Sequence, residues 1–60
     1  MPWNLDRFPP SMKHLPPPAL EKAIEIANAL LAEGYEEGRA IRIAIVQAKR
    51  WAQARGIELP

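Results

Sequence analysis

The sixty-residue sequence has no cysteine, no threonine, a single serine and a single histidine. Without cysteine, neither a disulfide framework nor a thiolate metal site can form. A Ser-His-Asp catalytic triad would need Ser11, His14 and Asp6. These residues lie in one short N-terminal segment that offers no scaffold for an oxyanion hole. The sequence therefore predicts a non-enzymatic protein with no metal and no cofactor.

Two other catalytic arrangements are disfavoured. Pro2 becomes the N-terminal amine if the initiator methionine is removed, and some small tautomerases use such an amine. Those enzymes need a β-α-β pattern, and the sequence shows no strand. The paired carboxylates are interpreted as solvated helix surface without a cleft: Glu21 with Glu25, and Glu36 with Glu37. No small-molecule substrate is predicted.

Long apolar segments are also missing. The longest uncharged run after Glu25 is "IANALLA", far below the about 20 residues that a membrane-spanning helix needs. The N-terminal segment "MPWNLDRFPP" carries an acid and lacks the apolar core of a signal peptide. We therefore expect a soluble cytoplasmic protein without membrane contact.

Proline is abundant and unevenly placed. Six of the seven prolines precede residue 19. They restrict the unfolded chain, which lowers the entropy that folding must remove. Residues 1–17 are predicted to form a proline-rich arm, with one short helical turn near residues 10–15. The hydrophobic fraction of 48% excludes a disordered chain, and sixty residues make one domain at most.

A helical period begins at Ala19. Leu20, Ile24, Ala27 and Leu31 repeat at i, i+4, i+7 and i+11, which predicts a helix near residues 18–33. Gly34 follows, and we expect it to close the helix in a Schellman motif. In that motif Tyr35 would meet Leu30.

A second helix is predicted near residues 36–55. Two carboxylates at its start suit the positive end of the helix dipole. The arginine–isoleucine alternation in "RAIRIAIV" covers only four residues, whereas a 3.6-residue period persists for about fifteen, so the segment is a helix and not a strand. Gly56 ends it as Gly34 ends the first helix.

The predicted fold class is all-α. One domain is expected, in which the arm, residues 1–17, packs on an antiparallel helical hairpin, residues 18–60. Both helical stripes are rich in alanine, which allows close approach. The expected core comprises Leu20, Ile24, Ala27, Leu31, Ile41, Ala44, Ile45 and Ala48, closed by Trp3, Phe8 and Met12. We expect Trp3 to be more than half buried. Trp51 is either a core residue or, if it is exposed, the anchor of a binding patch.

Charge on the second helix is one-sided, with five cations and no anion between Gly38 and Gly56. These cations can be a solvated face, can bind an acidic protein, or can bind nucleic acid. Ile43 and Val46 lie off the main stripe, flanked by Arg39 and Arg50. The candidate partner-binding residues are Arg39, Arg42, Ile43, Val46, Lys49 and Arg50.

An uncovered apolar face favours a partner, so the leading hypothesis is an interaction module that binds a protein or a second copy of itself. The alternative is a nucleic-acid-associated or ribosome-associated accessory protein that uses the basic helix. The position of the arm discriminates between them. If Ile43 and Val46 lie beneath the arm, the outer face is chiefly charged and the alternative gains.

Three segments carry a resemblance to a known family. "MPW", "PPSMKHLPPPALEKAIEIANALLAEGYEEGRAIRIA" and "AKRWA" resemble the N-terminal module of small bacterial YdaT-like proteins, over residues 1 to about 53. A more distant likeness is to ChaB, whose "LP-x-S-V-K-x-x-LP" opening is similar to residues 8–13. The resemblance implies a shared fold and a stress-related or regulatory label. ChaB is labelled a cation transport regulator. No catalytic residue is implied.

Overall fold

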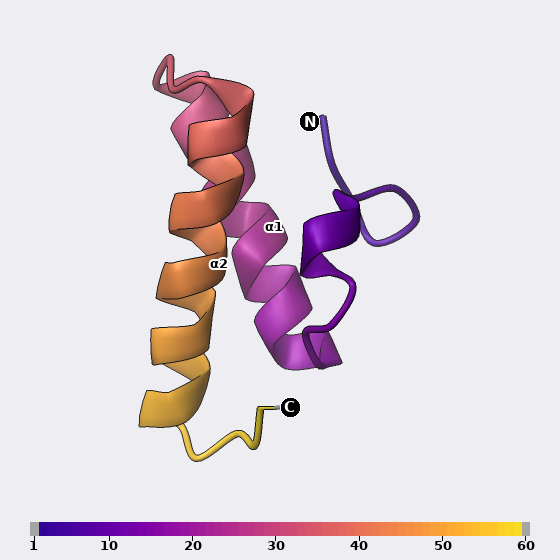
Figure 1. Ribbon diagram of the computed structural model, residues 1–60, viewed down its shortest axis with the longest axis vertical. Coiled ribbons are helices and arrows are strands. Elements are labelled where there is room, and N and C mark those ends of the chain that lie inside the picture. Colours follow the sequence, from indigo (N-terminus) through magenta and orange to yellow (C-terminus); the bar gives the residue numbers. More distant parts are fainter. Residues whose placement is uncertain (1, 60) are drawn as a thin grey trace.

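Three helical elements form in the computed structural model, which describes residues 2–59. A short 3₁₀ helix, η1 (Pro10–Met12), precedes α1 (Pro17–Ala32) and α2 (Glu37–Ala54). The two long helices lie side by side and antiparallel, and the arm lies beside α1 (Figure 1). The all-α prediction is confirmed, with helix bounds within one residue of those expected. Met1 and Pro60, the ends of the predicted domain, lie outside the described residues.

The proline triplet sets the start of α1. Pro16 is the N-cap residue in extended geometry, with φ −65° and ψ 157°. Its carbonyl accepts a hydrogen bond from the Leu20 N–H at 2.8 Å. Pro17 and Pro18 occupy the first turn, where a missing N–H costs nothing because no intrahelical acceptor exists there. Three consecutive prolines therefore begin the helix and do not break it.

Gly34 ends α1 in the predicted Schellman motif. It has φ 97°, a conformation that glycine adopts without steric cost. The Tyr35 N–H donates to the Leu30 carbonyl at 3.1 Å, and the Gly34 N–H donates to the Leu31 carbonyl at 3.0 Å. These are the two bonds that define the motif, so this prediction is confirmed.

The same closure recurs at the end of α2. Gly56 has φ 75°. The Ile57 N–H donates to the Ala52 carbonyl at 2.9 Å, and the Gly56 N–H donates to the Gln53 carbonyl at 3.1 Å. This turn brings Ile57 and Leu59 against the core.

Alanine forms the contact between the helices. The fully buried alanines are Ala19, Ala23 and Ala27 on α1, and Ala40, Ala44, Ala48 and Ala52 on α2. On each helix they recur every four residues, so they lie on one face. Small side chains let the two backbones approach closely, because the distance between packed helices depends on the residues at the contact.

The predicted core is therefore correct in part. Ile24, like the alanines expected in the core, is buried. Leu20, Ile41 and Ile45 are only partly buried and pack against the alanine contact from its sides. Leu31, also expected at the centre, is only partly buried. Among the branched side chains expected in the core, Ile24 alone is buried, and most of the others cover the flanks of the alanine contact.

The arm closes one side of this core. Met12 is fully buried and Leu15 nearly so, while Trp3 and Phe8 are partly buried against the same cluster. Trp3 is more than half buried, as expected. The buried Asn28 side chain ties the arm to α1, because it donates to the Trp3 carbonyl and accepts from the Trp3 N–H.

Candidate functional site

The outer face of α2 carries a stripe of four candidate residues. Arg39, Ile43, Val46 and Arg50 follow one another at steps of four, three and four residues, so they lie on one side of the helix. This side is opposite to the alanine face that meets α1. Val46 is 50% exposed. A large apolar side chain at the middle of this stripe is therefore open to solvent.

A shallow hollow lies on this face. Its volume is about 270 Å³, and it is lined by Arg42, Ile43, Val46, Gln47 and Arg50, all from α2. No residue of the arm lines it. The arm instead shares a hollow with Glu37 and Ile41, farther round the helix. Ile43 and Val46 are therefore not covered by the arm.

Two of the six predicted residues lie apart from this hollow. The Arg39 guanidinium lies over the Tyr35 ring, with its Cζ atom 5.7 Å from the ring centroid, in a cation–π contact. Lys49 is partly buried and does not line the hollow. Gln47 was not predicted, although its position four residues after Ile43 places it on the same side of α2.

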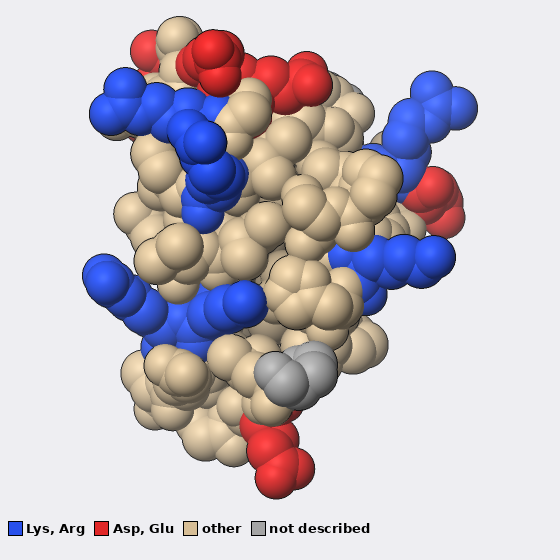
Figure 2. Space-filling view, viewed as in Figure 1, with Lys and Arg blue, Asp and Glu red and all other residues tan. Residues whose placement is uncertain are grey.

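The charges on α2 stay unpaired within the described part of the chain. Among residues 2–59 the one salt bridge joins Lys22 Nζ to Glu25 Oε1, at 3.1 Å, on α1. Lys and Arg side chains gather over α2 in two groups with uncharged surface between them, and acids lie near the turn that joins the helices (Figure 2). Arginine keeps its charge at any ordinary pH. The hollow is therefore apolar in its middle and positive at its rim.

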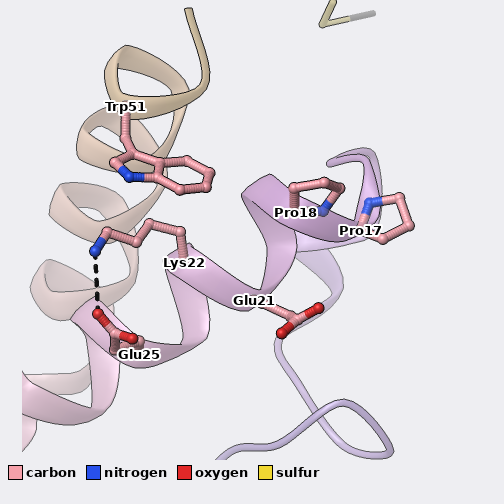
Figure 3. A pocket seen from close by; sticks show the side chains of 6 residues that line it. All are labelled: Pro17, Pro18, Glu21, Lys22, Glu25 and Trp51. Carbon is pink, nitrogen blue, oxygen red and sulfur yellow. Dashed lines mark hydrogen bonds and ion pairs between the residues drawn. The ribbon is translucent and has the colours of Figure 1, made fainter. Parts of the chain in front are cut away.

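Trp51 lies in a second hollow, of about 420 Å³, between α2 and the start of α1 (Figure 3). The Lys22 ammonium is 5.6 Å from an indole ring centroid, and the Arg55 guanidinium is 4.8 Å from one. Such cation–π contacts hold the ring and both cations in place. Trp51 is partly buried and packs against the core, so its indole ring contacts other residues of the same chain.

The three candidate catalytic residues of the arm stay apart within residues 2–59. Ser11, His14 and Asp6 are all exposed, and no hydrogen bond joins them in this range. No group of three or more His, Cys, Asp or Glu side chains is placed to hold a metal ion in the described chain. Across the same residues, neither long helix has the length and apolar character needed to cross a membrane.

Comparison with known proteins gives one curated match of high identity. The chain is 57% identical over 53 residues to the uncharacterised protein YdaT of Bacillus subtilis strain 168. Over these residues the chain is similar to YdaT. The match covers 88% of this chain and 35% of its relative, so the chain spans about a third of the length of the curated protein that it matches.

The YdaT resemblance predicted from the sequence is thus confirmed, while the more distant likeness to ChaB stays a prediction. No family model matches the chain. No solved structure matches it either. That relative is itself uncharacterised. The surface of α2 is therefore the part of the molecule that bears on function.

Proposed function

We propose that this chain is a non-enzymatic interaction module that binds a protein partner through the outer face of α2. One observation carries the proposal: the exposed Val46 and its neighbour Ile43 form the middle of a hollow that no other part of the described chain covers. An apolar centre with an arginine rim is the usual anatomy of a protein-binding surface.

The charge at the rim indicates an acidic partner. Arg42 and Arg50 have no carboxylate partner among residues 2–59. A guanidinium binds a carboxylate through two parallel hydrogen bonds, which adds orientation to the attraction. We expect the complex to form more slowly as salt rises, because exposed charges at a rim mainly steer association.

The biological setting is proposed from the resemblance and the composition. A YdaT-like module without a catalytic constellation acts by binding, which suits the regulatory or stress-related role that the resemblance implies. The cytoplasm is the location that we propose, on the grounds of composition. A second copy of the chain counts among the protein partners that this surface fits.

Nucleic acid is the second candidate partner, and the unpaired cations of α2 favour it. The helix can make about four phosphate contacts at most, so duplex binding would weaken with salt at a log-log slope of roughly −2 to −4. Gln47 and Gln53 are the only amide side chains on α2, so binding would tolerate any sequence. The exposed Val46 counts against this candidate, because phosphates gain nothing from an apolar centre.

A pull-down from lysate of the source cells, with and without nuclease, tests the proposal. The wild-type chain is compared with Arg42→Glu and with the control Lys13→Glu, which makes the same charge change on the exposed arm. Glutamate is a good helix former, so α2 is kept. We expect protein capture by the wild type and the control, loss in Arg42→Glu, and no effect of nuclease.

Equal capture by all three chains would overturn the protein-binding surface. Capture that nuclease removes would support the nucleic-acid candidate instead. A titration of labelled duplex at low salt tests the nucleic-acid candidate directly. A dissociation constant no tighter than about 100 μM would indicate that the cations of α2 only form a solvated surface.

A further inference from the structure

The arm presents one exposed apolar side chain on a rigid turn. Asn4 and Arg7 exchange two backbone hydrogen bonds, of 2.9 and 3.1 Å. The Asn4 Oδ1 atom also accepts from the backbone N–H groups of Asp6, at 2.8 Å, and of Arg7, at 2.9 Å. Leu5 and Asp6 form the tip of this turn. The tip is preorganised by four hydrogen bonds.

Leu5 at this tip has no cover within the described chain. It is 55% exposed, the most exposed of the large apolar side chains in residues 2–59. The residues that line one hollow with it include three acids, Asp6, Glu21 and Glu25, of which Glu25 is ion-paired with Lys22. The tip, which we call the Leu5–Asp6 knob, is therefore an apolar group in acidic surroundings.

The hollow on α2 has the complementary character. Ile43 and Val46 offer apolar surface to a leucine side chain, and Arg42 and Arg50 offer guanidinium groups to an aspartate. We infer that the Leu5–Asp6 knob of one copy docks in the α2 hollow of a second copy. This inference rests on the proposed function, since it names the occupant of the same surface.

Like charges exclude the simpler, symmetric arrangement. If two α2 faces met each other, the arginines of both copies would be brought together without a carboxylate between them, which is unfavourable. The knob and the hollow lie on different sides of the molecule: the arm lies on one side of α1 and α2 on the other (Figure 1). Each copy can therefore use both, and the contact extends from copy to copy without closing at two.

The contact is small, so it is weak. One leucine and one ion pair fall below the size of a stable interface, and we expect association only near about 1 mM protein. Because the contact is heterologous, it makes a sharp prediction. A variant without a knob and a variant without a hollow cannot assemble alone, but together they form a one-to-one pair.

The knob variant carries Leu5→Ser and Asp6→Ser, and the hollow variant carries Arg42→Gln and Val46→Gln. Neutral replacements create no new attraction. All four positions are exposed, so circular dichroism should show the wild-type fold. Ala29→Ser, at an exposed position on α1 that lines neither hollow, is the control and should associate as the wild type does. Sedimentation velocity at about 1 mM measures the state of each chain and of the mixture.

We expect the wild type and the control to form species larger than a dimer, each double variant to stay monomeric, and their mixture to stop at a dimer. A strictly monomeric wild type, or a mixture that does not pair, would overturn the inference. The proposed function is tested separately. If the chain is monomeric but still captures protein in an Arg42-dependent way, the α2 face remains a protein-binding surface and only the self-association is wrong. If neither self-association nor Arg42-dependent capture is found, both proposals are wrong.

Discussion

Asn28 of α1 and Trp3 of the arm hold each other by two hydrogen bonds. The Asn28 Nδ2 atom donates to the Trp3 carbonyl at 2.9 Å, and the Asn28 Oδ1 atom accepts from the Trp3 N–H at 3.3 Å. The two residues are twenty-five positions apart in sequence. A single amide side chain thus satisfies both backbone groups of a partly buried residue and fixes the arm on the hairpin.

Replacing Asn28 by Ala should therefore loosen the arm. The change leaves the Trp3 N–H and carbonyl without partners in a partly buried place, at a cost of about 2 kcal/mol. For a domain of this size we expect the melting temperature to fall by about 10 °C. Gln53→Ala, at an exposed site on α2, is the control. A melting temperature unchanged by Asn28→Ala would show that the pair does not anchor the arm.

Trp3→Ala tests the contribution of the arm to the core. Truncation of a buried tryptophan costs about 3 to 5 kcal/mol, and Trp3 is more than half buried against the core cluster. We expect a loss near about 3 kcal/mol in chemical denaturation, a large share of what so small a domain has. Leu5→Ala, at the exposed turn, should change stability by less than about 0.5 kcal/mol. Equal losses of stability from Trp3→Ala and Leu5→Ala would show that the arm does not contribute to the core.

The alanine contact predicts a strong dependence on side-chain size. Ala44 is fully buried where α2 meets α1, so Ala44→Leu should push the helices apart and cost about 1 to 3 kcal/mol or more. Ala54→Leu adds the same atoms at an exposed site on the same helix and should be tolerated. Denaturant midpoints of the two variants measure the difference. A stable Ala44→Leu variant would contradict the close approach.

Two glycines should respond to alanine in opposite directions. Gly34 has φ 97° and open space around it. Gly34→Ala should therefore lower the free energy of unfolding by about 1 to 2 kcal/mol, through backbone strain alone. Gly38 lies in the first turn of α2, where an added Cβ meets only the movable Glu36 Oε1 atom, at 3.3 Å. Gly38→Ala should therefore stabilise the chain, by about 0.5 kcal/mol. The same sign for both substitutions would exclude this account of the helix ends.

The elements and their ends could be predicted because their signals are local. The proline triplet begins α1, and Gly34 and Gly56 close the two helices, each through bonds to residues at most five positions away. The helical period identified which side of each helix turns inward. It could not rank the residues on that side, because the separation of the helices decides whether alanine or isoleucine fits at the centre.

Contacts between distant parts of the chain were not predictable in this way. Asn28 is the lone polar residue in "IANALLA", which marks it as unusual, but no local rule names Trp3 as its partner. At the candidate site, the period placed Ile43, Val46 and Arg50 on one side of α2. It also placed Arg39 there, although that side chain is drawn to Tyr35, four residues earlier.

The central claim is that the outer face of α2 binds protein, and photo-crosslinking from position 46 tests it most directly. Val46 is replaced in cells by benzoylphenylalanine, and the control places the same residue at Ala29, which is exposed on α1. A protein-binding face on α2 predicts a discrete protein adduct from position 46 on irradiation and none from position 29. Absence of a protein adduct at position 46, or equal adducts at both positions, would contradict it.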